Sequence, residues 1–125
     1  MNSIVDKLRS LELSMSQEKG KFLLFALVLR EDASDLWDLV VSSAWVTLNK
    51  SEALKYISNT LKNSLSPDEI LKISRIVTID PLNPDLLKWV RAINVEHGMA
   101  NVENCNFFGL NIKHAYIITS QFIID

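Results

Sequence analysis

The feature that most constrains the fold is an uninterrupted apolar run near the N-terminus. It extends from Phe22 to Leu29, and none of its eight residues is polar. A helix needs about 20 apolar residues to cross a bilayer, so the run is too short for a membrane span. It predicts a strand that is covered on both of its faces, although a buried helical segment would carry the same pattern.

The segment after this run predicts a hairpin. Turn-forming residues fill positions 31–35, and apolar residues return from Leu36 to Ser42 as a second strand. The two strands are then connected by a polar loop of about four to six residues.

Four helices are expected from the periodicity and from the cap residues. The first covers residues 3–15, where apolar side chains recur at helical spacing. The second and third begin with cap signals at Asn49 and Ser66, each followed three residues later by a glutamate. Pro84 opens the fourth helix, and Gly98 is expected to end it, because glycine readily takes the left-handed geometry of a helix C-terminus.

The remaining segments predict three more strands. Residues 75–80 form a short β-rich run, and polar and apolar residues alternate from about Val102 to Thr119. A two-residue turn at Phe108 and Gly109 would pair Phe107 with Leu110, Cys105 with Ile112, and Glu103 with His114. This register predicts that the apolar residues gather on one side of the hairpin, which carries Phe107, Cys105, Leu110, Ile112, Tyr116 and Ile118, with His114 on the same side.

The element order α-β-β-α-α-β-α-β-β predicts an α+β fold. We expect residues 1–125 to form a single domain, because no repeat or linker-like segment divides the chain. Its sheet is expected to be mixed or antiparallel, with about five strands and with helices on at least one face.

The composition limits the classes of partner. Lys and Arg are scattered singly and the net charge is −2, whereas nucleic-acid-binding proteins gather basic residues, so nucleic acid is not an expected partner. With Cys105 as the only cysteine and charged residues throughout the first twenty positions, we expect a cytoplasmic protein without membrane association. The apolar content of 48% is high for a small domain and favours a homo-oligomer, most simply a dimer.

Common cofactor and catalytic motifs are absent from the sequence. The three glycines are far apart, so no phosphate-binding loop can be written, and neither GxSxG nor HExxH occurs. We therefore expect no nucleotide cofactor, and whether the chain is an enzyme stays open.

Acidic residues crowd the first hairpin and indicate a candidate metal site. Asp32, Asp35 and Asp38 carry the hard oxygen ligands that Mg²⁺ prefers. Aspartate is also common in turns, because its side chain bonds the local backbone. Asp38 differs from the others because it lies within an apolar strand. If it faces inward its carboxylate must be paired, and a buried acid in a cleft is a candidate catalytic residue.

The two histidines are further catalytic candidates. His97 directly precedes Gly98, where a cation would complement the dipole of the fourth helix. His114 is expected opposite Glu103, a carboxylate that could orient the imidazole as a general base or simply satisfy a buried histidine. Together with Cys105 these histidines suit zinc by residue type, but their spacing matches no standard finger, and Cys105 also suits a small core position.

Two main functional hypotheses follow from these features. The first is a non-enzymatic module that acts by self-association or by binding another protein, with Trp45 as a candidate interface anchor. The second is a metal-assisted hydrolase or nuclease that uses the acidic group of the first hairpin, with a histidine as base. A third hypothesis is a pocket for a small polar ligand between the sheet and a helix.

Overall fold

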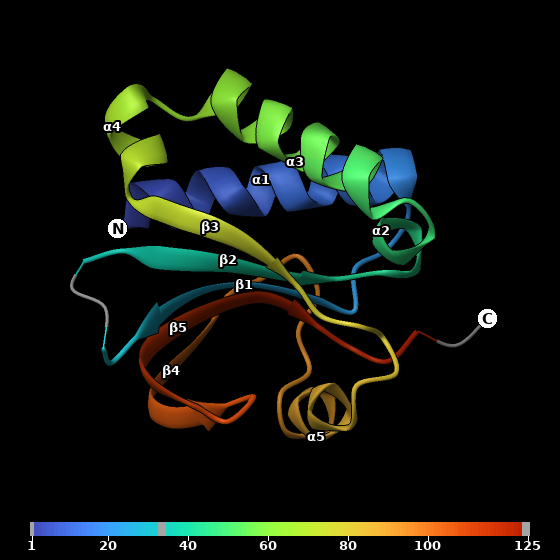
Figure 1. The fold of residues 1–125 in the computed structure, drawn as a ribbon, viewed down its shortest axis with the longest axis vertical. Coiled ribbons are helices and arrows are strands. Elements are labelled where there is room, and N and C mark those ends of the chain that lie inside the picture. The colour runs from blue at the N-terminus through green and yellow to red at the C-terminus, as the bar shows by residue number, and fades with distance from the viewer. Residues whose placement is uncertain (1, 33–34, 124–125) are drawn as a thin grey trace.

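The computed structural model describes residues 2–32 and 35–123, and these residues form the α+β fold expected from the sequence (Figure 1). No helix in these ranges is long and apolar enough to cross a membrane. The helices are α1 (Asn2–Lys19), α2 (Ala44–Leu48), α3 (Lys50–Ser64), α4 (Pro67–Leu71) and α5 (Pro84–Ala92). The strands are β1 (Leu24–Arg30), β2 (Trp37–Ser42), β3 (Ile73–Thr78), β4 (Ala100–Phe107) and β5 (Leu110–Ser120).

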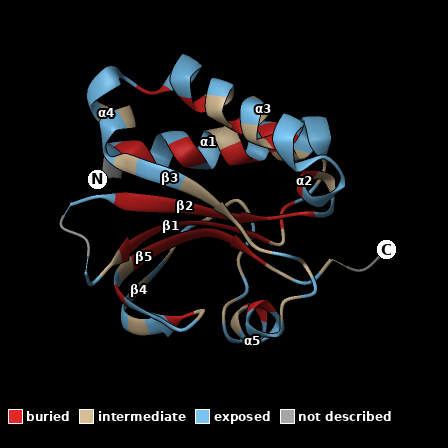
Figure 2. Ribbon diagram, in the orientation of Figure 1, coloured by how far each residue is buried: buried red, intermediate tan, exposed pale blue. Residues whose placement is uncertain are grey.

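The apolar run near the N-terminus forms the central strand of the sheet. The strand order is β3-β2-β1-β5-β4, in which β1 is antiparallel to both of its neighbours and β3 runs parallel to β2. Every residue of β1 is buried except the last, Arg30 (Figure 2). The prediction of a strand covered on both faces is therefore confirmed.

Helices lie on both faces of the sheet. Because side chains alternate along a strand, Phe25 and Leu27 enter a core beneath α1 and α3, while Ala26 and Val28 enter a second core beneath α5 (Figure 1). Among the described residues, the helix on the second face is α5, which contributes Leu86 to its core.

The helix starts follow the cap signals in the sequence. The side chain of Asn49 accepts from the Glu52 backbone, Ser66 and Glu69 form a reciprocal capping box, and Pro84 begins α5. One short helix, α2, had no such signal and was not predicted.

The predicted end of the fourth helix is wrong. The helix α5 stops at Ala92, and the chain turns extended because Val95 forms a bridge with Ser120 at the end of β5. The left-handed residue of this segment is His97, with φ 53°, and not Gly98. His97 therefore does not cap a helix, and it faces α1 instead.

The last hairpin has the predicted register but not the predicted faces. Phe108 and Gly109 both have positive φ, and the three predicted residue pairs across the hairpin are formed. However, the pairing of β5 with β1 skips Lys113, a β-bulge that shifts the alternation of side chains by one residue. As a result Phe107, Cys105 and Ile112 belong to the α5 side, whereas Tyr116 and Ile118 belong to the α1 side.

A buried glutamate attaches α1 to the sheet. Glu12 has no solvent-exposed surface, and its carboxylate accepts a hydrogen bond of 2.8 Å from the Thr119 hydroxyl on β5. Its other oxygen contacts Nδ1 of His97. Glu12 follows Leu8 by four residues, so it lies on the same buried stripe of the helix.

Replacement of Glu12 by alanine is expected to lower the free energy of unfolding by about 2–4 kcal/mol, because Thr119 and His97 lose their buried acceptor. Chemical denaturation monitored by tryptophan fluorescence measures this loss. The matched control is Asp6→Ala, an exposed acid on the same helix, for which a change below about 0.5 kcal/mol is expected. Equal stabilities of the two variants would contradict an anchoring role for Glu12.

Candidate functional site

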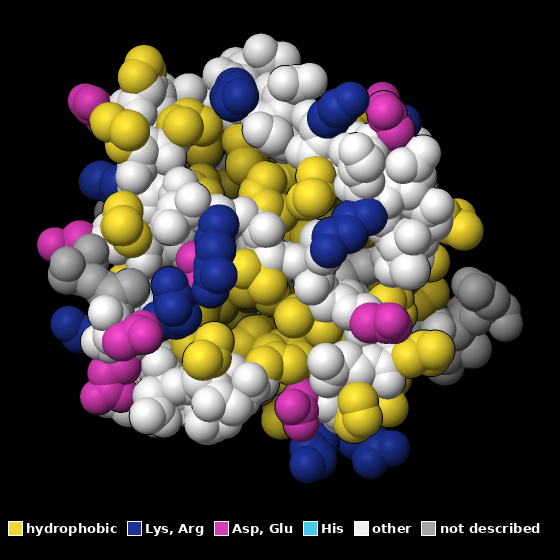
Figure 3. All heavy atoms as spheres, in the orientation of Figure 1, with side chains coloured by type: hydrophobic (Ala, Val, Ile, Leu, Met, Phe, Trp, Pro, Cys, Tyr) yellow, Lys and Arg dark blue, Asp and Glu magenta, His cyan; other side chains and the backbone are white. Residues whose placement is uncertain are grey.

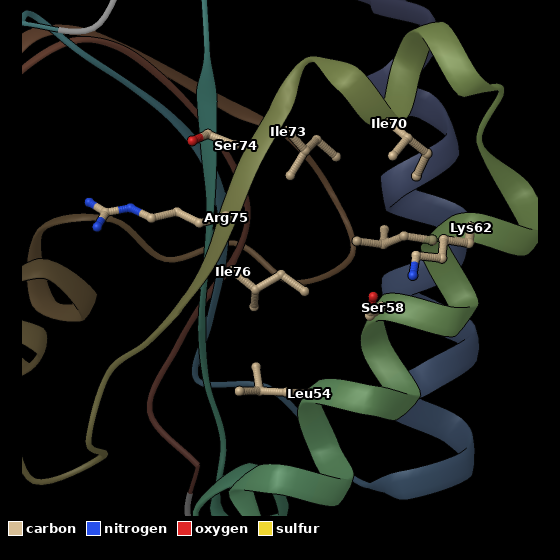
Figure 4. A pocket seen from close by; sticks show the side chains of 9 residues that line it. Leu54, Ser58, Lys62, Ile70, Ile73, Ser74, Arg75 and Ile76 are labelled. Carbon is tan, nitrogen blue, oxygen red and sulfur yellow. The ribbon is translucent and has the colours of Figure 1, made fainter.

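An apolar groove lies between the edge strand β3 and the helices α3 and α4. Its volume is about 390 Å³. Leu54, Ile70, Ile73 and Ile76 point into the space between helix and strand, whereas Arg75 points away toward the other face of the sheet (Figure 4). The complete lining is Leu54, Ser58, Leu61, Lys62, Ile70, Ile73, Ser74, Arg75 and Ile76.

The helix wall of the groove follows from the spacing of α3. Leu54, Ser58 and Leu61 are separated by four and three residues, so they share one face of the helix. This face shares Leu61 with the fully buried face of the helix, which also carries Ala53 and Ile57. The side of α3 that faces β3 is therefore only partly covered.

The end wall of the groove is the short helix α4, which is held by two sets of contacts. The Ser66–Glu69 capping box fixes its first turn. Lys7 on α1 forms an ion pair of 2.7 Å with Glu69, which ties α4 to the first helix. This position places Ile70 over the groove.

A second hollow follows along the same strand. Val46, Thr47 and Lys50 face Thr78, Ile79 and Asp80 around a space of about 260 Å³. Together the two hollows border β3 on the side that faces α3, from Ile73 to the end of the strand. In the space-filling view, apolar side chains line the bottom of the hollow on this side of β3, and basic side chains lie around it (Figure 3).

Asp38 faces inward, and arginines satisfy its charge. Its side chain is 5% exposed and lies on β2. From the neighbouring strand β3, Nη2 of Arg75 donates a hydrogen bond of 3.2 Å to one carboxylate oxygen, and its Nε lies 3.2 Å from the other. This bond to Asp38 raises the pKa of the Arg75 guanidinium above its ordinary value. The sequence predicted that an inward-facing Asp38 must be paired, and the structure shows this pairing.

Arg30 is the second cation beside Asp38. Its Nε lies 3.1 Å from a carboxylate oxygen, but the N–H does not point at that oxygen and makes no hydrogen bond among the described residues. The contact is therefore an ion pair by distance. Arg30 also lies 3.7 Å from the exposed Asp32.

The structure does not bring the predicted magnesium ligands together. Asp38 is bound by two arginines, Asp32 contacts one of them, and Asp35 is exposed in the loop with φ 59°. In residues 2–32 and 35–123 no three His, Cys, Asp or Glu side chains form a group that could hold a metal ion. The zinc combination of His97, Cys105 and His114 is likewise not assembled there.

The histidines have different partners from those predicted. His97 contacts the buried Glu12 through Nδ1, and its Nε2 lies 3.6 Å from Glu96. His114 lies opposite Glu103 as expected, but its Nε2 contacts the amide oxygen of Asn101, and Glu103 is exposed. Both imidazoles therefore contact other side chains of the protein.

The remaining candidates pack against the cores. Trp45 lies on α2, donates a hydrogen bond of 2.9 Å to the Gly20 carbonyl and packs edge-on against Phe22 and Tyr56. It is half-buried, so only part of its ring is left for a partner. Cys105 is partly buried on the α5 side, and this burial raises the pKa of its thiol.

Sequence reasoning missed the groove and the arginines that pair with Asp38. Arg30 ends the central apolar strand, and Arg75 lies in a β-rich run, so each was a charged residue at the margin of an apolar segment. Their meeting on one carboxylate depends on the parallel pairing of β2 with β3, which separates Asp38 and Arg75 by 37 residues in the sequence.

Comparison of the chain with protein-family models, curated proteins and solved structures finds no match in any of the three.

Replacement of Asp38 by asparagine is expected to lower the free energy of unfolding by about 2 kcal/mol, because two guanidinium groups lose their counter-charge. The cost is at the low end for a buried pair, since Arg75 is 52% exposed and remains hydrated. Asp35→Asn is the matched control and should be neutral. If Asp38 pairs only with the arginines, Mg²⁺ should leave the melting temperatures of wild type and Asp38→Asn unchanged. A magnesium site would instead make Mg²⁺ raise the melting temperature of the wild type and not that of Asp38→Asn.

The attachment of α4 is expected to depend on pH. Hydrogen bonds from Lys7 and from the Ser66 backbone lower the pKa of Glu69 from 4.5 to about 2. Because this pKa is lower in the folded state, the stabilisation is present above pH 4.5 and is lost as the pH falls toward 2. Melting temperatures across this range should show the difference between wild type and Glu69→Gln disappearing at low pH. A constant difference would contradict the account, and Glu103→Gln serves as the exposed control.

Proposed function

We propose that this chain is a protein-interaction module that binds an extended segment of another protein alongside β3. The observation that carries the proposal is the apolar groove between α3, α4 and the edge strand β3. Such a position offers two kinds of contact at once: backbone hydrogen bonds along the strand, and an apolar space for the side chains of the added segment.

The backbone of β3 supports the addition of a strand. Among the described residues, β3 pairs with β2 and has no strand on its other side. Ile79 donates to the carbonyl of Val41, so the alternation of a parallel ladder turns the backbone groups of Ile76 and Thr78 outward. A bulge at the start of β3 limits the regular stretch to Arg75–Thr78, which is long enough for a short added strand.

The charges around the groove favour an acidic partner. Lys50 and Lys62 line the helix side, and Asp80 is the acidic residue of the two linings. This local excess of positive charge contrasts with a net charge of −2 for the whole chain. A segment that carries acidic residues among apolar ones would complement both the rim and the floor.

The same charges disfavour a second copy as the occupant. In a two-fold contact through this surface, the lysines that line the groove would face the same lysines of the second copy. The predicted homodimer therefore requires another surface, and the proposed occupant of the groove is a different protein with an acidic, apolar segment.

The proposal is tested by selecting peptides from a random displayed library on the immobilised full chain and mapping their binding by NMR. Selected peptides are expected to combine acidic with apolar residues and to shift the amide signals of β3 and α3. Leu54→Glu should weaken binding by at least about tenfold, because it places a carboxylate on the groove wall. The matched control Leu82→Glu changes a leucine that is 84% exposed outside the groove, and it should leave binding unchanged.

Two outcomes would overturn the proposal. Peptides that bind Leu54→Glu as tightly as wild type, or that shift residues away from β3 and α3, would exclude the groove. A dimer in the native mass spectrum that Leu54→Glu dissociates would make a second copy the occupant.

A further inference from the structure

A separate small cavity lies on the opposite face of the sheet, the face that α5 covers. Its volume is about 90 Å³, and strands β1, β2, β3 and β5 contribute to its walls together with the tip of the last hairpin. In the space-filling view, apolar side chains line a hollow on this side of β3 as well (Figure 3). The lining is Val28, Arg30, Asp38, Val40, Arg75, Val77, Ile79, Phe107, Phe108, Leu110 and Ile112.

The polar wall of this cavity has an excess of cationic donors. Two guanidinium groups meet one buried carboxylate, that of Asp38. Arg75 donates to Asp38 from Nη2 and contacts it with Nε at ion-pair distance, and the buried Nε of Arg30 donates no hydrogen bond among the described residues. Within residues 2–32 and 35–123, Asp32 is the other acid in contact with these guanidinium groups; it is 74% exposed and 3.7 Å from Arg30, so water screens its charge.

The backbone at the cavity wall is strained at a bulky residue. Phe108 has φ 53° in a two-residue hairpin turn, a position where asparagine, aspartate or glycine is favoured. A left-handed conformation costs a residue with a side chain about 1–2 kcal/mol. The ring of Phe108 packs edge-on against Phe107 at 4.4 Å and forms part of the cavity wall.

We infer that this cavity binds a small carboxylate with a short aliphatic body. The carboxylate would accept from the donors of Arg30 and Arg75 that Asp38 leaves free, since guanidinium groups match carboxylates in geometry. The apolar body would occupy the space between the valines and the hairpin tip. Because a dry cavity of about 150 Å³ holds a benzene ring, about 90 Å³ admits about three or four carbon atoms.

The inference does not depend on the proposed partner at β3. The cavity lies on the α5 side of the sheet and the groove on the α3 side, and Arg75 and Ile79 are the residues that border both surfaces. Arg30 and Phe108 line only the cavity side, so changes there separate the two sites.

The test is a titration of the methyl-labelled full chain with isobutyrate, followed by NMR. Saturable shifts are expected at the methyl groups of Val28, Val40 and Ile112, with an affinity of about millimolar for so few ligand atoms. The neutral isobutyramide should give no saturable shift, and benzoate should bind about tenfold more weakly because its ring exceeds the cavity.

Two variants decide the roles of the residues. Arg30→Met keeps the aliphatic stem and should abolish isobutyrate binding. Lys62→Met, which likewise replaces a cation by methionine but lies at the groove, should leave it intact. Phe108→Asn provides a residue that the turn favours, so the fold should be retained while the cavity opens and binding is lost. Saturable binding of isobutyramide, retained binding by Arg30→Met or by Phe108→Asn, or shifts remote from the cavity would each overturn the inference.

Discussion

The burial of β1 on both faces is the constraint on which the rest of the structure depends. A strand that is apolar from Leu24 to Leu29 must be paired along both edges and covered on both faces. The chain supplies β2 and β5 as its neighbours and helices above and below it. β3 and β4 are the edge strands of the sheet, and each pairs with one neighbour among the described strands.

Each face of the sheet also contains one buried carboxylate with specific partners. Glu12 joins α1 to β5 on one face, and Asp38 joins β2 to β3 through Arg75 on the other. A buried acid is costly unless it is paired, so each of these contacts penalises an arrangement in which the helix or the edge strand is displaced. The position of β3, and therefore of the groove beside it, depends on the second contact.

The sequence predicted the parts of the fold that depend on local pattern. The central strand, the cap residues at Asn49 and Ser66, and the turn at Phe108 and Gly109 were each visible as short-range signals, and the structure confirms them. The end of α5 was predicted wrongly, because the bridge between Val95 and Ser120 overrides the helix signal at Gly98.

The candidate site was less accessible to sequence reasoning. Asp38 was identified as unusual, but its partners could not be named, because they depend on which strand lies next to β2. The bulge at Lys113 also reversed the faces of the last strand, so the environment of His114 could not be derived from alternation alone. Likewise, the groove is the space left between α3 and β3, and no single segment carries a signal for it.

The proposed binding depends on two features of the sheet: β1 is a fully protected centre, and β3 has an open edge. Amide hydrogen exchange of the free chain, measured residue by residue, tests this directly. In the free chain, exchange should be slow throughout β1 and fast at Ile76 and Thr78, whose N–H groups point outward. When a selected peptide binds, the amides of Ile76 and Thr78 should become protected. Slow exchange at Ile76 and Thr78 in the free monomer, or no added protection there on binding, would contradict it.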